Sequence, residues 1–513
     1  MAEGLFASLY EAGRPFALID TRERREHVDG HWFGGTNVPL SVLTTQITRM
    51  VPDRAFPVHL LDWQDAPSRA AAQRLTQLGY DNVSLCKTSR PDGFGCGFVK
   101  GEFVWSKTFG EVVAHTARLP EITPSDYIAN HQDALLFDVR PTAEYTQFTI
   151  PNSQSLPNSL MLANIDALKN TKKMALLHCA GRTRSIIGAC TLKAAGYDGP
   201  FAIFRGGTQA WQLDGHEREH GAQRLFAREV DDTKGVRDFL RKWEIPYEQV
   251  DGRDVTGFVS HHNSEHLFDV SDDAATGQRT GDGIMKISGT NLIQQTDRSI
   301  ARYHVPVVLF DHGSGSRAAF AAFWLRAMGF SVRVAYLTGP LTDSAAEFQK
   351  TVSDNISHDI LSAEQLVKFR DRPGSVLDFR PSQAYCQGHV KGSQWCNISD
   401  VLTRTNPAVP SSDPIVIIGN DIAHGDETAR LLSQHGWHIA GIHGWDETAM
   451  DPAQVVPGDI DSPIDQSALF AGRHHGNMQD SRDYLAWEEE LPHQIDQQLH
   501  TLWLRLLSRS ASA

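Results

Sequence analysis

The sequence has few cysteines, and they are scattered. Only six occur among 513 residues, without the spacing of a zinc-binding pair or of a disulfide framework. This usage suits a reducing, cytoplasmic environment. No stretch approaches the roughly 20 apolar residues of a membrane-spanning helix. The first residues, which include Glu3 and Glu11, lack the apolar core of a signal peptide. We therefore expect a cytoplasmic protein with no metal ion and no membrane partner.

Positive charge is also in the minority. The 48 lysines and arginines are outnumbered by 62 aspartates and glutamates, which gives a formal net charge of −14. An acidic chain is a poor partner for nucleic acid or for an anionic membrane surface, so we expect neither. The chain is too long for one hydrophobic core, and about three to five domains are expected.

One pattern is repeated four times along the chain. Each repeat begins with a short apolar stretch that ends in aspartate, namely Asp20, Asp138, Asp269 and Asp378. A second apolar stretch, a loop and a helical stretch follow, and the helical stretches end at Gly79, Gly196, Gly329 and Gly436. The alternation of strands and helices predicts an α/β fold, with a parallel sheet flanked by helices on both faces in every repeat.

Two independent spacings align the repeats. The positions 17 residues before the four glycines are Asp62, Cys179, His312 and Gly419, and they lie 42, 41, 43 and 41 residues after the four aspartates. This agreement supports four similar modules, each of ordinary domain size. We place the modules at residues 1–112, 118–224, 247–350 and 356–450, with a connector helix at 225–246 and a linker plus C-terminal helix at 451–513.

The most informative stretch is residues 174–185 in the second module. An apolar strand ends at His178, Cys179 opens a short loop, and a helix follows. Loop N–H groups and a helix N-terminus favour an anion at one spot, and Arg182 and Arg184 add positive charge. A cysteine held there should ionise more readily than a free thiol, and the thiolate is the nucleophile. We therefore predict that Cys179 is a catalytic nucleophile.

The alternative for a cysteine at a strand end is a small buried hydrophobic residue, which fits Cys190 and Cys396. Two nearby arginines would line a dry core poorly, which favours the catalytic interpretation of Cys179. His178 points to the opposite face of its strand from Cys179. We therefore expect His178 to be a packed histidine rather than a general base.

These features resemble the rhodanese (sulfurtransferase) superfamily. The resemblance rests on Asp138 and Arg140 after the first strand, on the cysteine-centred loop, and on the Gly-Gly-x-x-Ala-Trp pattern at residues 206–211. It covers nearly the whole chain except the tail, and the chain is similar to tandem four-module bacterial sulfurtransferases. At residues 148–151 the second module departs from the family, because the Gly-His segment found in modules one and four is replaced there by Phe-Thr-Ile-Pro.

The resemblance implies a two-step transfer of sulfane sulfur, without a cofactor, from thiosulfate or a similar donor to cyanide or a thiol. Cys179 would carry the sulfur as a persulfide. The predicted substrate-binding residues are those of the loop, namely Ala180, Gly181, Arg182, Thr183, Arg184 and Ser185, with the two arginines on the sulfonate oxygens.

Some of these residues have structural alternatives. Arg184 could instead pin the loop to a carboxylate such as Asp138 or Glu144, and both alternatives stay open. Asp138 and Arg140 recur in modules that lack the cysteine, which indicates structural support rather than catalysis. The modules with Asp62, His312 and Gly419 at the nucleophile position are interpreted as inactive scaffold or docking modules.

Two other functions are compatible with the same residues. A non-catalytic sulfur-relay or regulatory protein would explain why three of four modules lack the cysteine. A cysteine phosphatase would share the His-Cys and Arg-Ser pairs, but only four residues separate Cys179 from Arg184 where five are typical. In the tail, one helical face carries Ile495, Leu499, Leu502 and Leu506. That face packs either on the body or on a second copy, which would make a homodimer.

Overall fold

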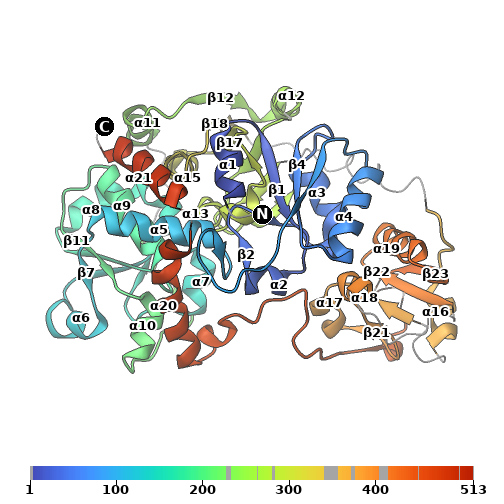
Figure 1. Cartoon of the computed structure of the whole chain (residues 1–513). Helices are drawn as coiled ribbons and strands as arrows, with labels where there is room; N and C mark the ends of the chain where they lie inside the picture. The colour runs from blue at the N-terminus through green and yellow to red at the C-terminus, as the bar shows by residue number, and fades with distance from the viewer. Residues whose placement is uncertain are drawn as a thin grey trace.

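The protein is built around four β-sheets, which follow one another along the chain (Figure 1). The computed structural model describes residues 4–226, 233–262, 264–279, 284–339, 356–370, 376–403, 414–446, 448, 450–495 and 497–511. Each sheet is mainly parallel and flanked by helices, so the α/β fold expected from the sequence is confirmed. None of the helices in the described part of the chain has the length and hydrophobicity needed to cross a lipid bilayer.

The first module has the strand order β16-β1-β4-β5, and β3 also pairs with β1. Its strands are β1 (Phe16–Asp20), β3 (Thr36–Asn37), β4 (Val58–Asp62) and β5 (Val83–Lys87), and β2 (His31–Trp32) pairs separately with β6 (Phe98–Val99). Its helices are α1 (Leu5–Glu11), α2 (Arg24–Asp29), α3 (Leu43–Met50), α4 (Ala66–Gln77) and α5 (Val104–Ala117).

The second module has a fully parallel sheet of order β7-β11-β10-β8-β9. Its strands are β7 (Glu121–Ile122), β8 (Leu135–Asp138), β9 (Gln154–Ser155), β10 (Ala175–His178) and β11 (Phe201–Phe204). Its helices are α6 (Pro124–Asn130), α7 (Thr142–Gln147), α8 (Ile165–Thr171), α9 (Thr183–Ala194) and α10 (Gly207–Leu213). All four residues of β10 are buried, because this strand lies in the middle of the sheet and is covered on both faces.

The third module has the order β12-β18-β17-β13-β15-β14, with β14 antiparallel to its neighbour. Its strands are β12 (Tyr247–Asp251), β13 (His266–Asp269), β14 (Thr276–Arg279), β15 (Met285–Ile287), β17 (Val307–Asp311) and β18 (Val332–Thr338). Its helices are α11 (Thr233–Lys242), α12 (Val255–His261), α13 (Gly289–Gln294), α14 (Thr296–Ser299) and α15 (Ser316–Ala327). Helix α11 lies in the expected connector, of which residues 227–232 fall outside the described residues.

The fourth module has the order β21-β19-β22-β23. Its strands are β19 (Val376–Asp378), β21 (Gln394–Trp395), β22 (Ile415–Gly419) and β23 (Ile439–Gly444), and β20 (His389–Val390) pairs separately with β24 (Val455–Val456). Its helices are α16 (Ala363–Arg370), α17 (Ser382–Gln387), α18 (Ile398–Thr403) and α19 (Ile422–Gln434). In each of the four modules one strand ends at the aspartate that marks the repeat, namely β1, β8, β13 and β19.

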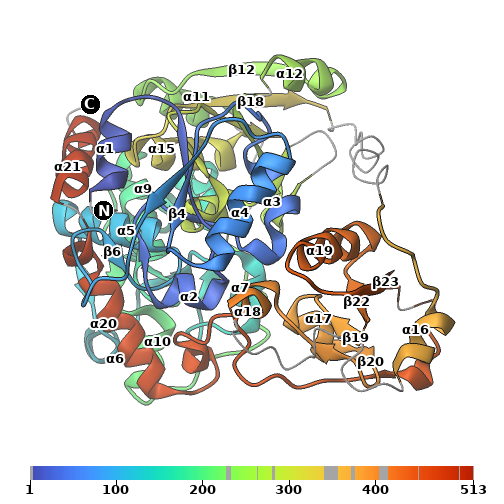
Figure 2. The same cartoon turned by 45° about the vertical axis from the view of Figure 1, so that its right-hand side comes forward.

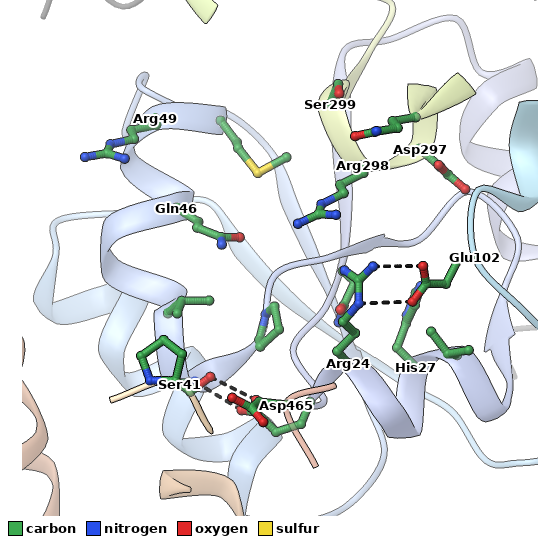
Figure 3. Close-up of a pocket in the computed structure, with 18 of the residues that line it drawn as sticks. Arg24, His27, Ser41, Gln46, Arg49, Glu102, Asp297, Arg298, Ser299 and Asp465 are labelled. Atoms are coloured by element: carbon green, nitrogen blue, oxygen red, sulfur yellow. Dashed lines mark hydrogen bonds and ion pairs between the residues drawn. The ribbon is translucent and has the colours of Figure 1, made fainter. Parts of the chain in front are cut away.

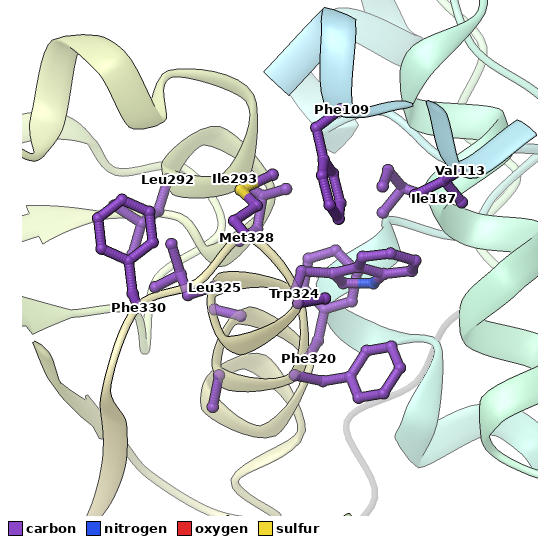
Figure 4. Close-up of a cluster of buried hydrophobic side chains, with 14 of the residues drawn as sticks. Phe109, Val113, Ile187, Leu292, Ile293, Phe320, Trp324, Leu325, Met328 and Phe330 are labelled. Atoms are coloured by element: carbon purple, nitrogen blue, oxygen red, sulfur yellow. The ribbon is translucent and has the colours of Figure 1, made fainter. Parts of the chain in front are cut away.

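The modules share strands and hydrophobic cores. Strand β16 (Arg302–Tyr303) belongs to the third module in sequence, but it pairs antiparallel with β1 of the first module. Figure 4 shows helix α15 of the third module packed against α5 and α9, with Trp324 beside Phe109 and Ile187. The indole N–H of Trp324 donates to Thr191 Oγ1 at 2.9 Å. These shared contacts join modules one to three into one packed body, while Figure 2 shows module four to one side.

The tail forms two helices rather than the single amphipathic face expected from the sequence. Helix α20 (Met478–Gln494) ends before Ile495, whose extended backbone separates it from α21 (Gln497–Ala511). Pro492 in the last turn of α20 lacks an N–H, which favours an end at this point. Leu499 and the fully buried Trp503 pack α21 onto the body, and Leu506 lies outside the described side chains.

We predict that Trp324→Ala destabilises the protein by about 3–5 kcal/mol, because a large aromatic side chain is deleted from the core shared by three modules. Unfolding in urea, followed by tryptophan fluorescence and circular dichroism, measures the loss. The control is Leu225→Ala, since Leu225 is 61% exposed and its loss should change stability by less than about 0.5 kcal/mol. Equal stability of the two variants would contradict the shared core.

Candidate active site

The cysteine loop lies at the carboxyl end of β10, in the middle of the second sheet. Cys179 follows the strand directly, and α9 begins four residues later at Thr183. The carbonyl oxygens of Cys179 and Ala180 accept hydrogen bonds from the backbone of α10, at 2.9 Å from Thr208 N–H and 3.1 Å from Gln209 N–H. Both carbonyls are therefore tied to the neighbouring helix.

The backbone N–H groups of residues 180–184 have no hydrogen-bond acceptor among the described residues. Part of this follows from helix geometry, because the first N–H groups of a helix have no partner within it. Donors of this kind, next to the positive end of the α9 dipole, favour an anion. The loop therefore has several backbone donors without an acceptor among the described residues, and anion binding by them stays a prediction.

Cys179 is 2% exposed, and it belongs to the buried cluster that modules one to three share. Its Sγ lies 3.9 Å from Ser185 Oγ, which itself donates to the carbonyl oxygen of Arg182 at 2.7 Å. Cys190, on the same helix α9, is a contrast, because burial raises the pKa of its thiol to about 12. At neutral pH Cys190 is therefore a protonated, unreactive thiol.

The two loop arginines are both engaged in ion pairs. Arg184 bonds to Glu144 at 2.7 Å. Although burial opposes its charge, Glu144 and the Cys179 sulfur raise the pKa of Arg184, so a fixed positive charge lies beside the sulfur. Arg184 thus forms an ion pair that ties the loop to a carboxylate, which was one of the two roles considered for it. The other role was binding of the donor's sulfonate oxygens.

The contacts of Arg182 differ from our expectation that its guanidinium is free to bind the oxygen atoms of a sulfur donor. Its guanidinium makes two hydrogen bonds to Glu111 on α5, at 2.9 and 3.0 Å, and an ion pair with Glu489 on α20 at 3.0 Å. Glu121 lies 3.7 Å away. With three carboxylates around it, this side chain holds the loop to α5 and to the tail.

Asp138 and Arg140 form a buried pair behind the loop. The guanidinium bonds to both carboxylate oxygens, at 2.7 and 2.9 Å, and Thr149 donates to the same carboxylate at 2.8 Å. Although burial opposes ionisation, Arg140 and other partners keep the pKa of Asp138 well below its usual range. Equivalent pairs join Asp20 to Arg22 and Asp378 to Arg380 in modules without the cysteine. The pair therefore braces the fold wherever it occurs.

His178 is fully buried and bonded away from the cysteine side chain. Its Nε2 lies 2.7 Å from Ser153 Oγ, and burial lowers its pKa. A neutral histidine in this place packs the core of the module.

Helix α20 of the tail covers the loop. Glu488 accepts from Thr183 Oγ1 at 2.8 Å and pairs with Lys107 of α5 at 3.0 Å. Tyr484 also bonds to Lys107. A Cβ atom placed on Gly181 would lie 2.8 Å from both Tyr484 and Glu488, so only glycine leaves room for this helix. The second Glu488 oxygen is buried and has no partner among the described residues.

The corresponding loops of the other modules are filled by the chain itself. In module three the Asp311 carboxylate accepts from the N–H groups of His312 and Ala318, at 2.8 and 3.0 Å. In module one Asp62 accepts from the N–H of Gln64 at 2.8 Å. In module four a Cβ on Gly419 would lie 2.4 Å from a backbone nitrogen of α19. Only the second of these four loops combines a cysteine with unoccupied donors.

A family model described as "Rhodanese-like domain" matches residues 123–214 and 362–447, which lie in the second and fourth modules. These two modules are therefore rhodanese-like domains. In modules one and three, the strand that ends at the aspartate also lies beside the strand that precedes the loop, as it does in modules two and four. This family model does not match modules one and three. No curated protein matches the chain by sequence.

The rhodanese assignment agrees with a crystal structure of thiosulfate sulfurtransferase from Pseudomonas aeruginosa. That structure is 26% identical to this chain, covers 96% of each chain and has a TM-score of 0.79. A rhodanese-like domain protein from Staphylococcus aureus is 25% identical, covers 20% of this chain and 100% of its own, and has a TM-score of 0.17. An Escherichia coli 3-mercaptopyruvate sulfotransferase is 17% identical, covers 42% and 97%, and has a TM-score of 0.21. The comparison rests on the Pseudomonas aeruginosa structure, which is similar over the whole chain, because the TM-scores of the other two structures are low.

Sequence reasoning missed the residues that cover this rhodanese loop. Tyr484 and Glu488 are four residues apart and therefore share one face of a helix, but about 300 residues separate them from Cys179. Lys107 and Glu111 share a face of α5 in the same way. Helical spacing could have grouped each pair, but it gives no sign of the loop against which the pair packs.

We predict that Glu488→Gln exposes Cys179 to small thiol reagents. The substitution weakens the buried pair with Lys107, and a loss of about 1.4 kcal/mol from the closed arrangement would raise its open population about tenfold. The rate of Cys179 alkylation by iodoacetamide, followed by mass spectrometry of the peptide, measures the change.

The matched control is Glu490→Gln, an exposed glutamate on the same helix. It should react at the wild-type rate, and circular dichroism should show both variants folded. If Cys179 is alkylated equally fast in both variants, the ion pair does not hold α20 over the loop.

Proposed function

We propose that the protein is a sulfurtransferase that moves a sulfane sulfur from thiosulfate, or a similar donor, to cyanide or a thiol through a persulfide on Cys179. The observation that carries the proposal is the pairing of Cys179 with the N–H groups of residues 180–184, which have no acceptor within the described chain. The likeness to a thiosulfate sulfurtransferase over 96% of both chains supports the choice of donor.

The reaction follows from these groups in two steps. The Cys179 thiolate attacks the outer sulfur of thiosulfate, the sulfur–sulfur bond breaks, and sulfite leaves with the electron pair. The persulfide that remains is an anion, and the loop N–H groups donate hydrogen bonds to it. A second nucleophile, such as cyanide, then attacks the outer sulfur, and Cys179 leaves as the thiolate.

The remaining loop residues have separate roles in the proposal. Ala180, Gly181 and Thr183 present backbone N–H groups to the donor, and the Ser185 hydroxyl lies 3.9 Å from the Cys179 sulfur. Arg184 stabilises the thiolate through its charge. Arg182 is a positioning residue, because its guanidinium is already paired with Glu111 and Glu489. Asp138 and Arg140 support the loop from behind.

The other modules serve as the scaffold in this proposal, with the bounds 1–112, 247–350 and 356–450. The second module, 118–224, is the catalytic one, and the first module and the tail contribute the cover over its loop through Lys107 and Glu488. All six cysteines are free, which supports a reducing compartment such as the cytoplasm.

Cys179→Ser should abolish thiocyanate formation from thiosulfate and cyanide while the fold is kept. The hydroxyl is a far weaker nucleophile than a thiolate and cannot form a persulfide. Mass spectrometry after thiosulfate treatment should show one added sulfur on Cys179 of the wild type, lost when cyanide is added. Cys190→Ser, on the same helix, is the control and should retain activity.

Three outcomes would count against this assignment. Turnover that survives Cys179→Ser would place the reaction elsewhere. Sulfur loading without steady-state turnover would favour a relay protein. Release of phosphate from an aryl phosphate, without sulfur transfer, would favour a phosphatase.

Arg184→Gln should lower kcat/KM for thiosulfate by about tenfold or more. The charge of Arg184 interacts with the Cys179 sulfur, and the loss of a charge-assisted interaction of about 1.4 kcal/mol in the transition state lowers kcat/KM about tenfold. Arg184→Lys keeps the charge and should recover part of the loss, although a lysine cannot reproduce the guanidinium geometry. Equal kcat/KM in Arg184→Gln and wild type would remove Arg184 from the mechanism.

A further inference from the structure

A cavity of about 880 Å³ lies where modules one, three and four meet (Figure 3). Its walls come from α2 and α3 of the first module, from α14 of the third, and from the loop before α19 of the fourth. No residue of the Cys179 loop lines it. The cavity is therefore a separate feature, built by the three modules that lack the cysteine.

Two arginines face this cavity from different modules. Arg24 uses Nε and Nη2 to bond to Glu102, at 3.0 and 2.8 Å, and its Nη1 has no partner among the residues that the structure describes. Arg298 has no hydrogen-bond or ion-pair partner for its guanidinium among the described residues. In Figure 3 the Arg298 side chain extends toward Arg24 across the open space.

This arrangement of charges favours a bound anion. Partial burial in the cavity and the charge of Arg24 both lower the pKa of Arg298, so the two cations repel one another. An anion between them would convert that repulsion into two charge-assisted interactions. Gln46, whose side-chain amide also has no partner in the described chain, lies on the opposite wall and can donate a further hydrogen bond.

Acidic groups on other walls of the cavity indicate which further chemical groups the ligand carries. One Asp297 oxygen is buried without a partner among the described residues, and the same is true of one Asp465 oxygen. A rotation of either carboxylate toward the cavity would let it accept from a ligand donor, such as an amine, amide or hydroxyl. A volume of this size suits an organic molecule rather than a bare inorganic ion.

We propose that this cavity binds a small organic anion, whose carboxylate or phosphate is held by Arg24 and Arg298 and whose hydrogen-bond donors face Asp297 and Asp465. The three modules that have no cysteine at the loop position thereby form a binding site between them. This inference does not depend on sulfur transfer at Cys179, because none of its residues belongs to that loop.

Isothermal titration calorimetry of the full chain carrying Cys179→Ser tests the proposal, since no chemistry at the loop can then contribute heat. Four probes separate the ligand's features at low ionic strength. Sulfate is an inorganic anion, tricarballylate is an organic anion without donors, glutathione combines carboxylates with amine and amide donors, and AMP combines a phosphate with donors. We expect glutathione or AMP to bind more tightly than sulfate and tricarballylate, and to weaken as salt is added.

Arg298→Gln should weaken the binding of the better probe by about tenfold or more, and Arg24→Gln should do the same. Arg69→Gln removes the same charge from an exposed site on α4 outside the cavity and should leave binding unchanged. The preference between glutathione and AMP decides whether the anionic group is a carboxylate or a phosphate.

Several results would overturn the proposal. These are the absence of binding by all four probes, binding that persists unchanged in Arg298→Gln, and an equal loss in Arg69→Gln. Since the titration is carried out without the cysteine, a failure here leaves the proposed sulfur transfer unaffected. Conversely, loss of sulfur transfer would not change the expected binding.

Discussion

The structure depends on which groups accept hydrogen bonds from the backbone N–H donors of one loop in each module. In every repeat a strand ends at the carboxyl edge of a parallel sheet and a helix follows, so backbone N–H groups gather where no carbonyl can reach them. Module three fills this place with Asp311, module one binds Asp62 there, and module four packs its loop onto α19. The second module alone leaves the donors open beside a cysteine. Four copies of one fold thus differ in the group that occupies a single position.

The rest of the chain is arranged around that open loop. Helix α5 of the first module contributes Lys107 and Glu111, and α20 contributes Glu488 and Glu489, so the loop is enclosed by residues from both ends of the chain. Burial of Lys107 and Glu488 costs hydration free energy, and their mutual attraction offsets part of it. A covered, polar site of this kind strengthens every electrostatic interaction within it.

Much of the fold could be predicted from the sequence, because local patterns determine it. The four aspartates do end strands, and Cys179 does open the loop between β10 and α9. The partners of Arg182 and the break in the tail at Ile495 could not be predicted. They depend on contacts between residues far apart in the chain, for which hydrophobic periodicity carries no signal. The same limit applies to the cavity between modules, whose walls meet only after the modules pack.

Strand β16 of the third module pairs with the sheet of the first module, and this pairing has a consequence for synthesis on the ribosome. The first sheet gains its edge strand only when Tyr303 has been translated, so the N-terminal module waits for nearly two further modules before it is complete. The enclosure of the cysteine comes later still, since α20 begins only at Met478. Until α20 has been translated, the loop lacks this cover, and a chain truncated before α20 would lack it as well.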